Sequence, residues 1–307
     1  MEDKIKRLNE LRKQRNAVIL AHYYQPDEIQ EVADFLGDSL ALAQRAKSTN
    51  ADVILFCGVH FMAETAKILN PQRIVLLPDL NSGCSLADSA PEKEFRLWRE
   101  AHADHTVISY VNCSTQVKAM SDIICTSSNA EKIINSLPKD AKICFAPDKN
   151  LGAYLNKKCG RNMVLWDGSC EVHNIFSEES LKKIQRENLY APILAHPECP
   201  ENLLSYADFV GSTKAILDFA KKCDSTEFII LTEPGVNFRL KKENPNKTFH
   251  YVEGLGDCGC NTCKYMKLNT LDKMINALEN LEPQINLPED LRLRALKPLE
   301  RMLELSK

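Results

Sequence analysis

The residues best suited to metal chemistry in this chain are cysteines that follow turns containing glycine. Such turns occur at three places, Ser82-Gly83-Cys84, Gly168-Ser169-Cys170 and Gly256-Asp257-Cys258-Gly259-Cys260, and Cys263 follows the third. Glycine lets the backbone approach an inorganic cluster closely, and thiolate is the soft ligand that iron-sulfur centres select. One thiolate from each place would suit a 4Fe-4S cluster with one open iron, which could act as a Lewis acid.

Zinc is a competing metal for these cysteines. Cys258, Cys260 and Cys263 lie close together, and His173 follows Cys170 by three residues. The spacing nevertheless differs from the two Cys-x-x-Cys pairs of a zinc ribbon. Cysteines in or beside apolar runs are instead expected to be small buried hydrophobes: Cys57, Cys113, Cys125, Cys144, Cys159 and Cys223. Cys199, in a polar turn, is expected to be structural.

Polar side chains that can move protons or hold anions follow several short apolar runs. The pairs are His22 with Tyr24, Tyr110 with Asn112, and His196 with Glu198, and the hydroxyls are those of Ser39, Ser127 and Thr213. The ends of parallel strands form a ligand-binding edge, because helix N-termini and free amides converge there. Any one of these residues could instead be structural, as a hydrogen-bonded histidine or a helix cap. Their recurrence at equivalent places favours a shared site.

The elements that would position these residues form a threefold repeat. The segment 33–39 reappears as 207–213 and more faintly as 121–127, so that Asp34, Asp122 and Asp208 are equivalent. Each repeat has four apolar runs separated by helix-like stretches, which indicates a parallel sheet buried on both faces. We therefore expect an α/β fold of three αβα domains, each with a four-stranded parallel sheet, and an active site at their central junction.

The domain limits expected from the repeats are 1–88, 89–174 and 175–307. The first domain would include an amphipathic N-terminal helix with Ile5, Leu8 and Leu11 on its apolar face. The third would include C-terminal helices, one of them capped by Thr270.

Composition excludes several classes of protein. The 307 residues are 44% hydrophobic and 26% charged, as in globular proteins, and a net charge of −3 argues against nucleic acid as a partner. No apolar run is long enough to span a bilayer, and the charged N-terminus lacks a secretory apolar segment, so we expect a cytoplasmic protein without membrane contact. In a reducing cytosol its 12 cysteines would remain available as thiolates.

Other sequence patterns do not support a different cofactor. Gly254-x-Gly256-x-x-Gly259 has the spacing of a dinucleotide-binding fingerprint, but it overlaps the cysteine-rich turn and no strand with an acidic end follows it. A phosphate-loop lysine motif is absent from the sequence, and so is the Cys-x-x-x-Cys-x-x-Cys signature of radical enzymes that use S-adenosylmethionine.

Seven segments match the motifs of one enzyme family. They are LAHYYQ (20–25), GDS (37–39), DLNSGCSLA (79–87), YVN (110–112), WDGSCEVH (166–173), HPEC (196–199) and CKYMK (263–267). With them the chain resembles quinolinate synthases over nearly its whole length. The resemblance implies condensation of iminoaspartate with dihydroxyacetone phosphate to quinolinate, with release of phosphate and two waters, in NAD biosynthesis. It also implies transient contact with the enzyme that supplies iminoaspartate.

The resemblance also implies roles for individual residues. Tyr24, Tyr110 and Glu198 would transfer protons. The donors for carboxylates and phosphate would be His22, Ser39, Asn112, Ser127, His173, His196, Ser212 and Thr213. The 4Fe-4S cluster would be held by Cys84, Cys170 and Cys263.

Two lines of inference disagree about the third cluster ligand. His196 precedes Cys258 by the same interval that separates His22 from Cys84, so the repeat alignment favours Cys258 or Cys260. The resemblance favours Cys263, because the family ligand is followed by an aromatic residue and methionine. We expect Cys263, since loop lengths between repeats drift more freely than a ligand and its helix. Many family members have Cys-x-x-Cys-x-x-Cys here, one residue longer, so the disulfide inferred for that motif is not carried over.

Two alternative functions remain open at the level of sequence. Another 4Fe-4S hydro-lyase acting on a hydroxy acid would share the open cluster but would need no phosphate site. A non-catalytic electron carrier would ordinarily have four cysteine ligands and no histidine, tyrosine and glutamate beside the metal.

Overall fold

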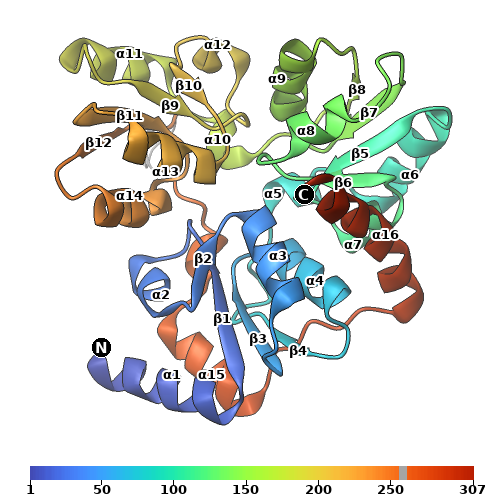
Figure 1. Cartoon of the computed structure of the whole chain (residues 1–307), viewed down its shortest axis with the longest axis vertical. Coiled ribbons are helices and arrows are strands. Elements are labelled where there is room, and N and C mark those ends of the chain that lie inside the picture. The colour runs from blue at the N-terminus through green and yellow to red at the C-terminus, as the bar shows by residue number, and fades with distance from the viewer. Residues whose placement is uncertain (256–260) are drawn as a thin grey trace.

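The computed structural model describes residues 1–255 and 261–307. Within these ranges the chain forms three four-stranded parallel sheets with interleaved helices, and the three units surround a common centre (Figure 1). This confirms the fold expected from the repeats. No helix in the described ranges is both long enough and apolar enough to cross a membrane.

The first unit has the strand order β2-β1-β3-β4. Its strands are β1 (Ala17–His22), β2 (Phe35–Gly37), β3 (Val53–Cys57) and β4 (Ile74–Leu76). Its helices are α1 (Glu2–Gln14), α2 (Asp27–Val32), α3 (Ser39–Ser48), α4 (His60–Leu69) and α5 (Ser85–Asp88). Every residue of β3 is buried, which explains why this central strand has a continuous apolar sequence.

The second unit repeats this strand order as β6-β5-β7-β8. Its strands are β5 (Thr106–Tyr110), β6 (Ile123–Cys125), β7 (Ile143–Ala146) and β8 (Val164–Leu165). Its helices are α6 (Glu92–Ala101), α7 (Thr115–Ala119), α8 (Ala130–Asn135), α9 (Lys149–Cys159) and α10 (Glu171–Asn174). The equivalent central strand, β7, is again fully buried.

The third unit has the order β10-β9-β11-β12. Its strands are β9 (Ile193–Ala195), β10 (Phe209–Val210), β11 (Glu227–Leu231) and β12 (Thr248–Tyr251). Its helices are α11 (Glu178–Glu187), α12 (Glu201–Leu204), α13 (Thr213–Lys222), the 3-10 helix η1 (Pro234–Val236) and α14 (Asn237–Glu243). After the third unit come the 3-10 helix η2 (Met266–Leu268) and two helices, α15 (Leu271–Asn280) and α16 (Glu289–Leu305).

The aspartate that recurs in the three repeats ties together the first two strands of each unit. The carboxylates of Asp34, Asp122 and Asp208 accept the backbone N–H groups of Ile19, Val107 and Ile193 at 2.8, 2.7 and 2.8 Å. The aspartate backbone N–H groups donate in return to the carbonyls of the same three residues. Each carboxylate thus supplements the parallel ladder just before the short second strand begins. The repeated residue is therefore architectural.

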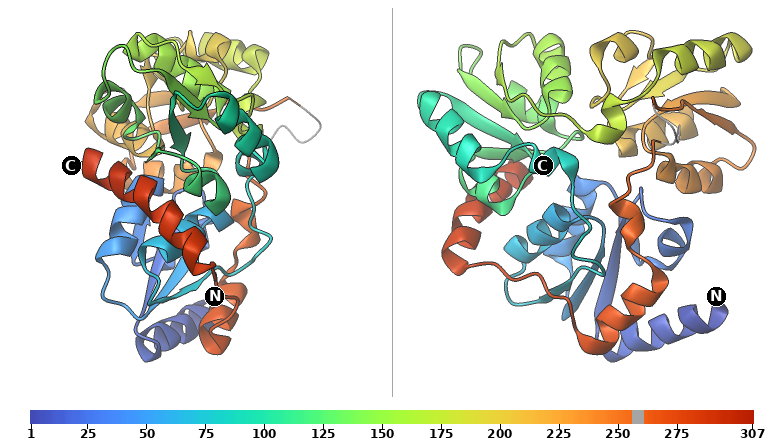
Figure 2. Two further views of the ribbon diagram at one scale, coloured as in Figure 1. Left: turned by 90° about the vertical axis from the view of Figure 1, so that its right-hand side faces the viewer. Right: turned by 180° about the vertical axis from the view of Figure 1, so that it is seen from behind.

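The helices at the two ends of the chain pack on units other than the third. Leu8 and Leu11 of α1 are buried with α15 against the first sheet, and Thr270 caps α15 as expected, its hydroxyl accepting the Lys273 N–H. Helix α16 packs on α7 and β6 of the second unit and also contacts α4 of the first (Figures 1 and 2). The C-terminal segment therefore leaves the third unit, packs on the first through α15 and reaches the second through α16. The domain limits 1–88, 89–174 and 175–307 remain a proposal.

We predict that the contact made by α16 contributes measurably to stability. Leu299 is fully buried on this helix, whereas Leu293 on the same helix is 48% exposed. Leu299→Ala should lower the free energy of unfolding by about 2–5 kcal/mol, because it leaves a cavity, and Leu293→Ala should change it by less than about 0.5 kcal/mol. Thermal denaturation of both variants tests this. Equal effects would mean that α16 does not dock as described.

Candidate active site

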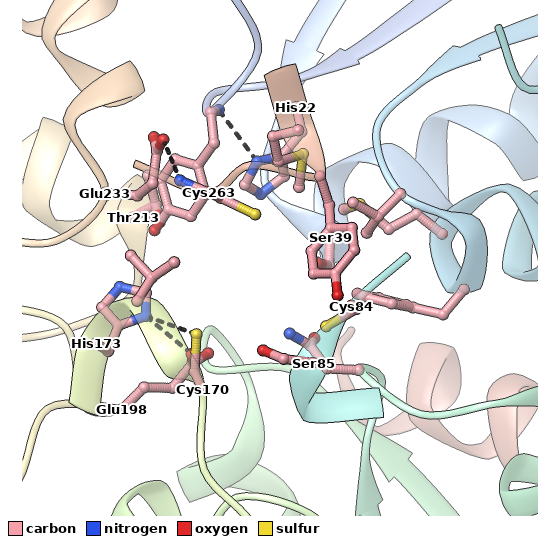
Figure 3. A pocket seen from close by; sticks show the side chains of 18 of the residues that line it. His22, Ser39, Cys84, Ser85, Cys170, His173, Glu198, Thr213, Glu233 and Cys263 are labelled. Atoms are coloured by element: carbon pink, nitrogen blue, oxygen red, sulfur yellow. Dashed lines mark hydrogen bonds and ion pairs between the residues drawn. The ribbon is translucent and has the colours of Figure 1, made fainter. Parts of the chain in front are cut away.

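One cavity lies where the carboxyl ends of the three sheets face one another. Its wall includes every site residue predicted from the sequence except Ser212, that is His22, Tyr24, Ser39, Cys84, Tyr110, Asn112, Ser127, Cys170, His173, His196, Glu198, Thr213 and Cys263. Figure 3 shows side chains from all three units pointing into this space. The polar residues that follow the strands of the three repeats therefore line one common cavity, as expected if the repeats share an axis.

The three cysteine turns deliver their thiols to the same cavity. Cys84 and Cys170 occupy the N-cap positions of α5 and α10, and Cys263 lies shortly before η2. Their sulfur atoms point into the cavity from three directions in Figure 3. Burial raises the pKa of all three thiols, that of Cys263 to about 11. The free thiols are therefore protonated at neutral pH, and a metal centre would have to displace those protons on binding.

Two equivalent turns fix the histidines at the ends of β1 and β9. The Tyr24 N–H donates to Nδ1 of His22 at 3.1 Å, and the Glu198 N–H donates to Nδ1 of His196 at 3.4 Å. In both rings Nδ1 is thus an acceptor, so the proton of the neutral ring lies on Nε2. Burial lowers the pKa of both histidines to about 3. They are neutral hydrogen-bond donors at physiological pH.

Glu198 is the centre of a buried polar cluster. Its Oε1 accepts the Tyr110 hydroxyl at 2.6 Å, and its Oε2 lies 3.0 Å from Nδ1 of His173, which stacks on His196. Burial opposes ionisation of Glu198, but its contacts with His173 and the hydrogen bond from Tyr110 outweigh burial and lower the carboxyl pKa. The ligand atoms of Cys170, His173 and Glu198 all lie within 4.8 Å of one another and could hold a metal ion.

Tyr24 is linked to this cluster through a threonine. Its hydroxyl lies 2.6 Å from the Thr213 hydroxyl and 2.8 Å from that of Thr232, and Thr232 lies 3.0 Å from Nε2 of His173. Burial raises the pKa of Tyr24 and of Tyr110, so both phenols stay protonated. Tyr24, Tyr110 and Glu198, which were predicted separately, therefore lie on one continuous hydrogen-bonded network.

Hydroxyl and amide groups provide a second kind of lining. Ser39 and Thr213 begin α3 and α13, so their hydroxyls lie where helix N-termini favour anions. Ser127 precedes α8 in the second unit. Asn112 Oδ1 is buried without a hydrogen-bond partner among the described residues, which suits a group that meets a ligand. The hydroxyls could donate to carboxylate or phosphate oxygens, and Asn112 Oδ1 could accept a hydrogen bond from a ligand N–H or O–H.

Some predicted residues lie elsewhere. Ser212 does not line the cavity in the described part of the chain; its hydroxyl caps α13 by accepting the Ala215 N–H. Cys199 is fully buried, and its thiol donates to the Leu231 carbonyl, as expected of a structural residue. Cys258 and Cys260, together with Gly256 and Gly259 of the glycine pattern, lie outside the described residues.

Sequence reasoning missed several buried residues around the cavity. Thr232 joins Tyr24 to His173, and Glu233 lines the cavity with its side chain fully buried. Asp148, also fully buried, lies behind Cys170. These residues follow the third strand of their units, whereas the prediction considered polar residues after the first, second and fourth strands. Two polar residues directly after the apolar run EFIIL were the available signal.

Sequence comparison with known proteins identifies the family of this chain. The family model described as quinolinate synthetase A protein matches residues 6–304. Proteins named quinolinate synthase from Prochlorococcus marinus (strain MIT 9313) and Chloroherpeton thalassium are each 56% identical, over 96% and 99% of this chain and 89% and 95% of their own lengths. A quinolinate synthase from Synechocystis is 55% identical over 99% of this chain and 96% of its own. The chain therefore belongs to the quinolinate synthetase A family of enzymes.

Proposed function

We propose that this protein condenses iminoaspartate with dihydroxyacetone phosphate to form quinolinate, phosphate and two waters, as a step of NAD biosynthesis. The names of its relatives support the reaction. The observation that carries the proposal is that three thiols and the network of Tyr24, Tyr110 and Glu198 face the same cavity. Ring formation needs enolisation and loss of water, and this cavity combines proton-transfer groups with soft metal ligands.

Cys84, Cys170 and Cys263 would hold a 4Fe-4S cluster. The donor set fits this group, because three thiols and no fourth cysteine line the cavity in the described part of the chain. When bound, such a cluster supplies an open iron as a Lewis acid that can assist the departure of water. The position of Cys263 in the cavity wall supports it as the third ligand, and Cys258 and Cys260 lie outside the described residues.

The ionised Glu198 is suited to remove a proton from a bound substrate. The Tyr110 hydroxyl, which donates to Glu198 Oε1, can return a proton on the same side of the cavity. Protonated Tyr24 can act as an acid from the opposite end of the network, and Thr232 and His173 connect it to Glu198. The proton taken up by Glu198 would pass back to Tyr110, or through His173 and Thr232 to Tyr24, as that phenol gives its own proton to the substrate, so neither phenol would remain charged.

The substrate anions would be held mainly by neutral donors. His22 and His196 would each present Nε2–H, and Ser39, Asn112, Ser127, His173 and Thr213 would add further hydrogen bonds. Ser212 would act indirectly, by capping the helix that Thr213 begins. Donors of this kind bind carboxylate and phosphate while leaving Glu198 as the base.

We predict that the anaerobically purified protein forms quinolinate from iminoaspartate and dihydroxyacetone phosphate, with one phosphate released per product. Chromatography of quinolinate and a phosphate assay measure both. A protein that dehydrates hydroxy acids but ignores this pair would be a hydro-lyase, and one that only cycles electrons would be a carrier. Either result would contradict the proposed reaction.

We predict that Tyr24→Phe, Tyr110→Phe and Glu198→Gln each lower turnover by about 10²–10⁴-fold, because each removes one proton-transfer group with little change in volume. Steady-state rates at matched iron content measure the effect. Tyr154→Phe is the control, since Tyr154 lies outside the cavity wall and bonds Lys158 on α9. Normal rates in all three cavity variants would show that the network only packs and caps.

A further inference from the structure

Two buried carboxylates occupy equivalent positions behind two of the cysteine turns. Asp148 and Glu233 each come two residues after the third strand of their unit, β7 and β11, and each begins the helix that follows. Both are fully buried. The proposed function assigns neither a role.

Each carboxylate uses one oxygen for its helix and the other for a cysteine. Asp148 Oδ1 accepts the Leu151 N–H at 2.7 Å, and Oδ2 accepts the Cys170 N–H at 3.2 Å. Glu233 Oε2 accepts the Gly235 N–H at 2.6 Å, and Oε1 accepts the Cys263 N–H at 3.1 Å. A serine cap has one oxygen and would serve only the helix. The carboxylate is what allows the same residue to hold the cysteine backbone.

A second backbone contact supports the first two cysteine turns. The Lys149 N–H donates to the Gly168 carbonyl at 2.8 Å, and in the first unit the equivalent His60 N–H donates to the Ser82 carbonyl at 2.7 Å. Each carbonyl belongs to the residue two before the cysteine. In the third unit the equivalent residue is Pro234, which has no N–H to donate. The third turn must therefore rely more on its carboxylate.

The first unit differs from the third, because it keeps the backbone contact and lacks the carboxylate. Val59 takes the place of Asp148 and Glu233, so the Cys84 turn has the backbone contact but no carboxylate from this position. In the third unit a further charge reinforces the carboxylate. Lys267 Nζ lies 3.1 Å from Glu233 Oε1 and also donates to the Tyr24 carbonyl at 2.5 Å. From these two equivalent positions, the Cys84 turn thus receives the backbone contact, the Cys170 turn receives both contacts, and the Cys263 turn receives the carboxylate.

Stability alone does not explain these two carboxylates. The side chains of Asp148 and Glu233 are both fully removed from solvent, and burying a carboxylate costs free energy. Neutral caps such as serine or asparagine would begin the same helices without this cost. A group retained at such a cost is expected to serve the site.

We propose that Asp148 and Glu233 are positioning residues that hold the backbones of Cys170 and Cys263 so that both thiols face the cavity. Groups behind metal ligands commonly fix ligand orientation in this way. The inference rests on the proposed function in taking these cysteines as cluster ligands. It ranks the two turns: the Cys263 turn, with Pro234 beside it, depends more strongly on its carboxylate than the Cys170 turn does.

Backbone hydrogen exchange in the cluster-free protein tests the positioning role without any use of activity. Asp148→Ser keeps a helix cap for Leu151 but removes the acceptor of Cys170. The Cys170 amide should exchange at least about tenfold faster while the Leu151 amide stays protected, which makes Leu151 an internal control. Glu233→Gln, which loses the charge and one acceptor, should accelerate the Cys263 amide by a larger factor. Unchanged exchange at both cysteines would overturn the proposal.

Iron loss to a chelator under anaerobic conditions tests whether the held backbone supports the cluster. Both variants should release iron faster than the parent protein, Glu233→Gln more so. The matched control is Glu178→Gln, since Glu178 bonds Asn202 and Tyr206 on the outer side of the third unit. Unchanged release rates would contradict the inference even if exchange rises. A parent protein that binds no iron would instead contradict the proposed function, so the two failures are distinguishable.

Discussion

Parallel strand pairing is the constraint on which this site depends, because it puts the carboxyl ends of all strands of a sheet on one edge. Three such edges face a single cavity here, so residues separated by most of the chain become neighbours. The units also meet directly at this junction, where the Ser128 hydroxyl lies 2.5 Å from Asp38 Oδ2 and 2.8 Å from Ser212 Oγ. Each of these three residues comes from a different unit.

Convergence of three sheets also removes the site from water, and the electrostatics follow from that. Burial keeps His22 and His196 neutral and both phenols protonated, and it opposes ionisation of the thiols. Glu198 is the exception, since its contacts with His173 and Tyr110 stabilise its charge. The cavity therefore separates a base from neutral donors by local contacts. Because the chain has a net charge of −3, it offers no broad positive field to attract anions, and local donors must bind them.

Sequence periodicity was sufficient for the fold, because buried parallel strands need continuous apolar runs and the repeat fixed their order. It also located the cavity residues that follow the first and second strands of each unit. It could not distinguish Ser212, which caps α13, from Thr213 beside it, which lines the cavity, since that depends on side-chain direction. Nor could it find Thr232 or Glu233, whose roles come from contacts with Tyr24 and Cys263 made only after the units meet.

The most direct test of the account is the iron content of the anaerobically purified chain, compared with its single Cys→Ala variants. The parent protein should carry about four irons per chain. Cys84→Ala, Cys170→Ala and Cys263→Ala should lose them, while Cys258→Ala and Cys260→Ala should retain them. Cys223→Ala, whose residue does not line the cavity, is the control and should also retain them. A full cluster in Cys263→Ala with loss in Cys258→Ala or Cys260→Ala would identify a different third ligand. Stoichiometric zinc in place of iron would contradict the cluster altogether.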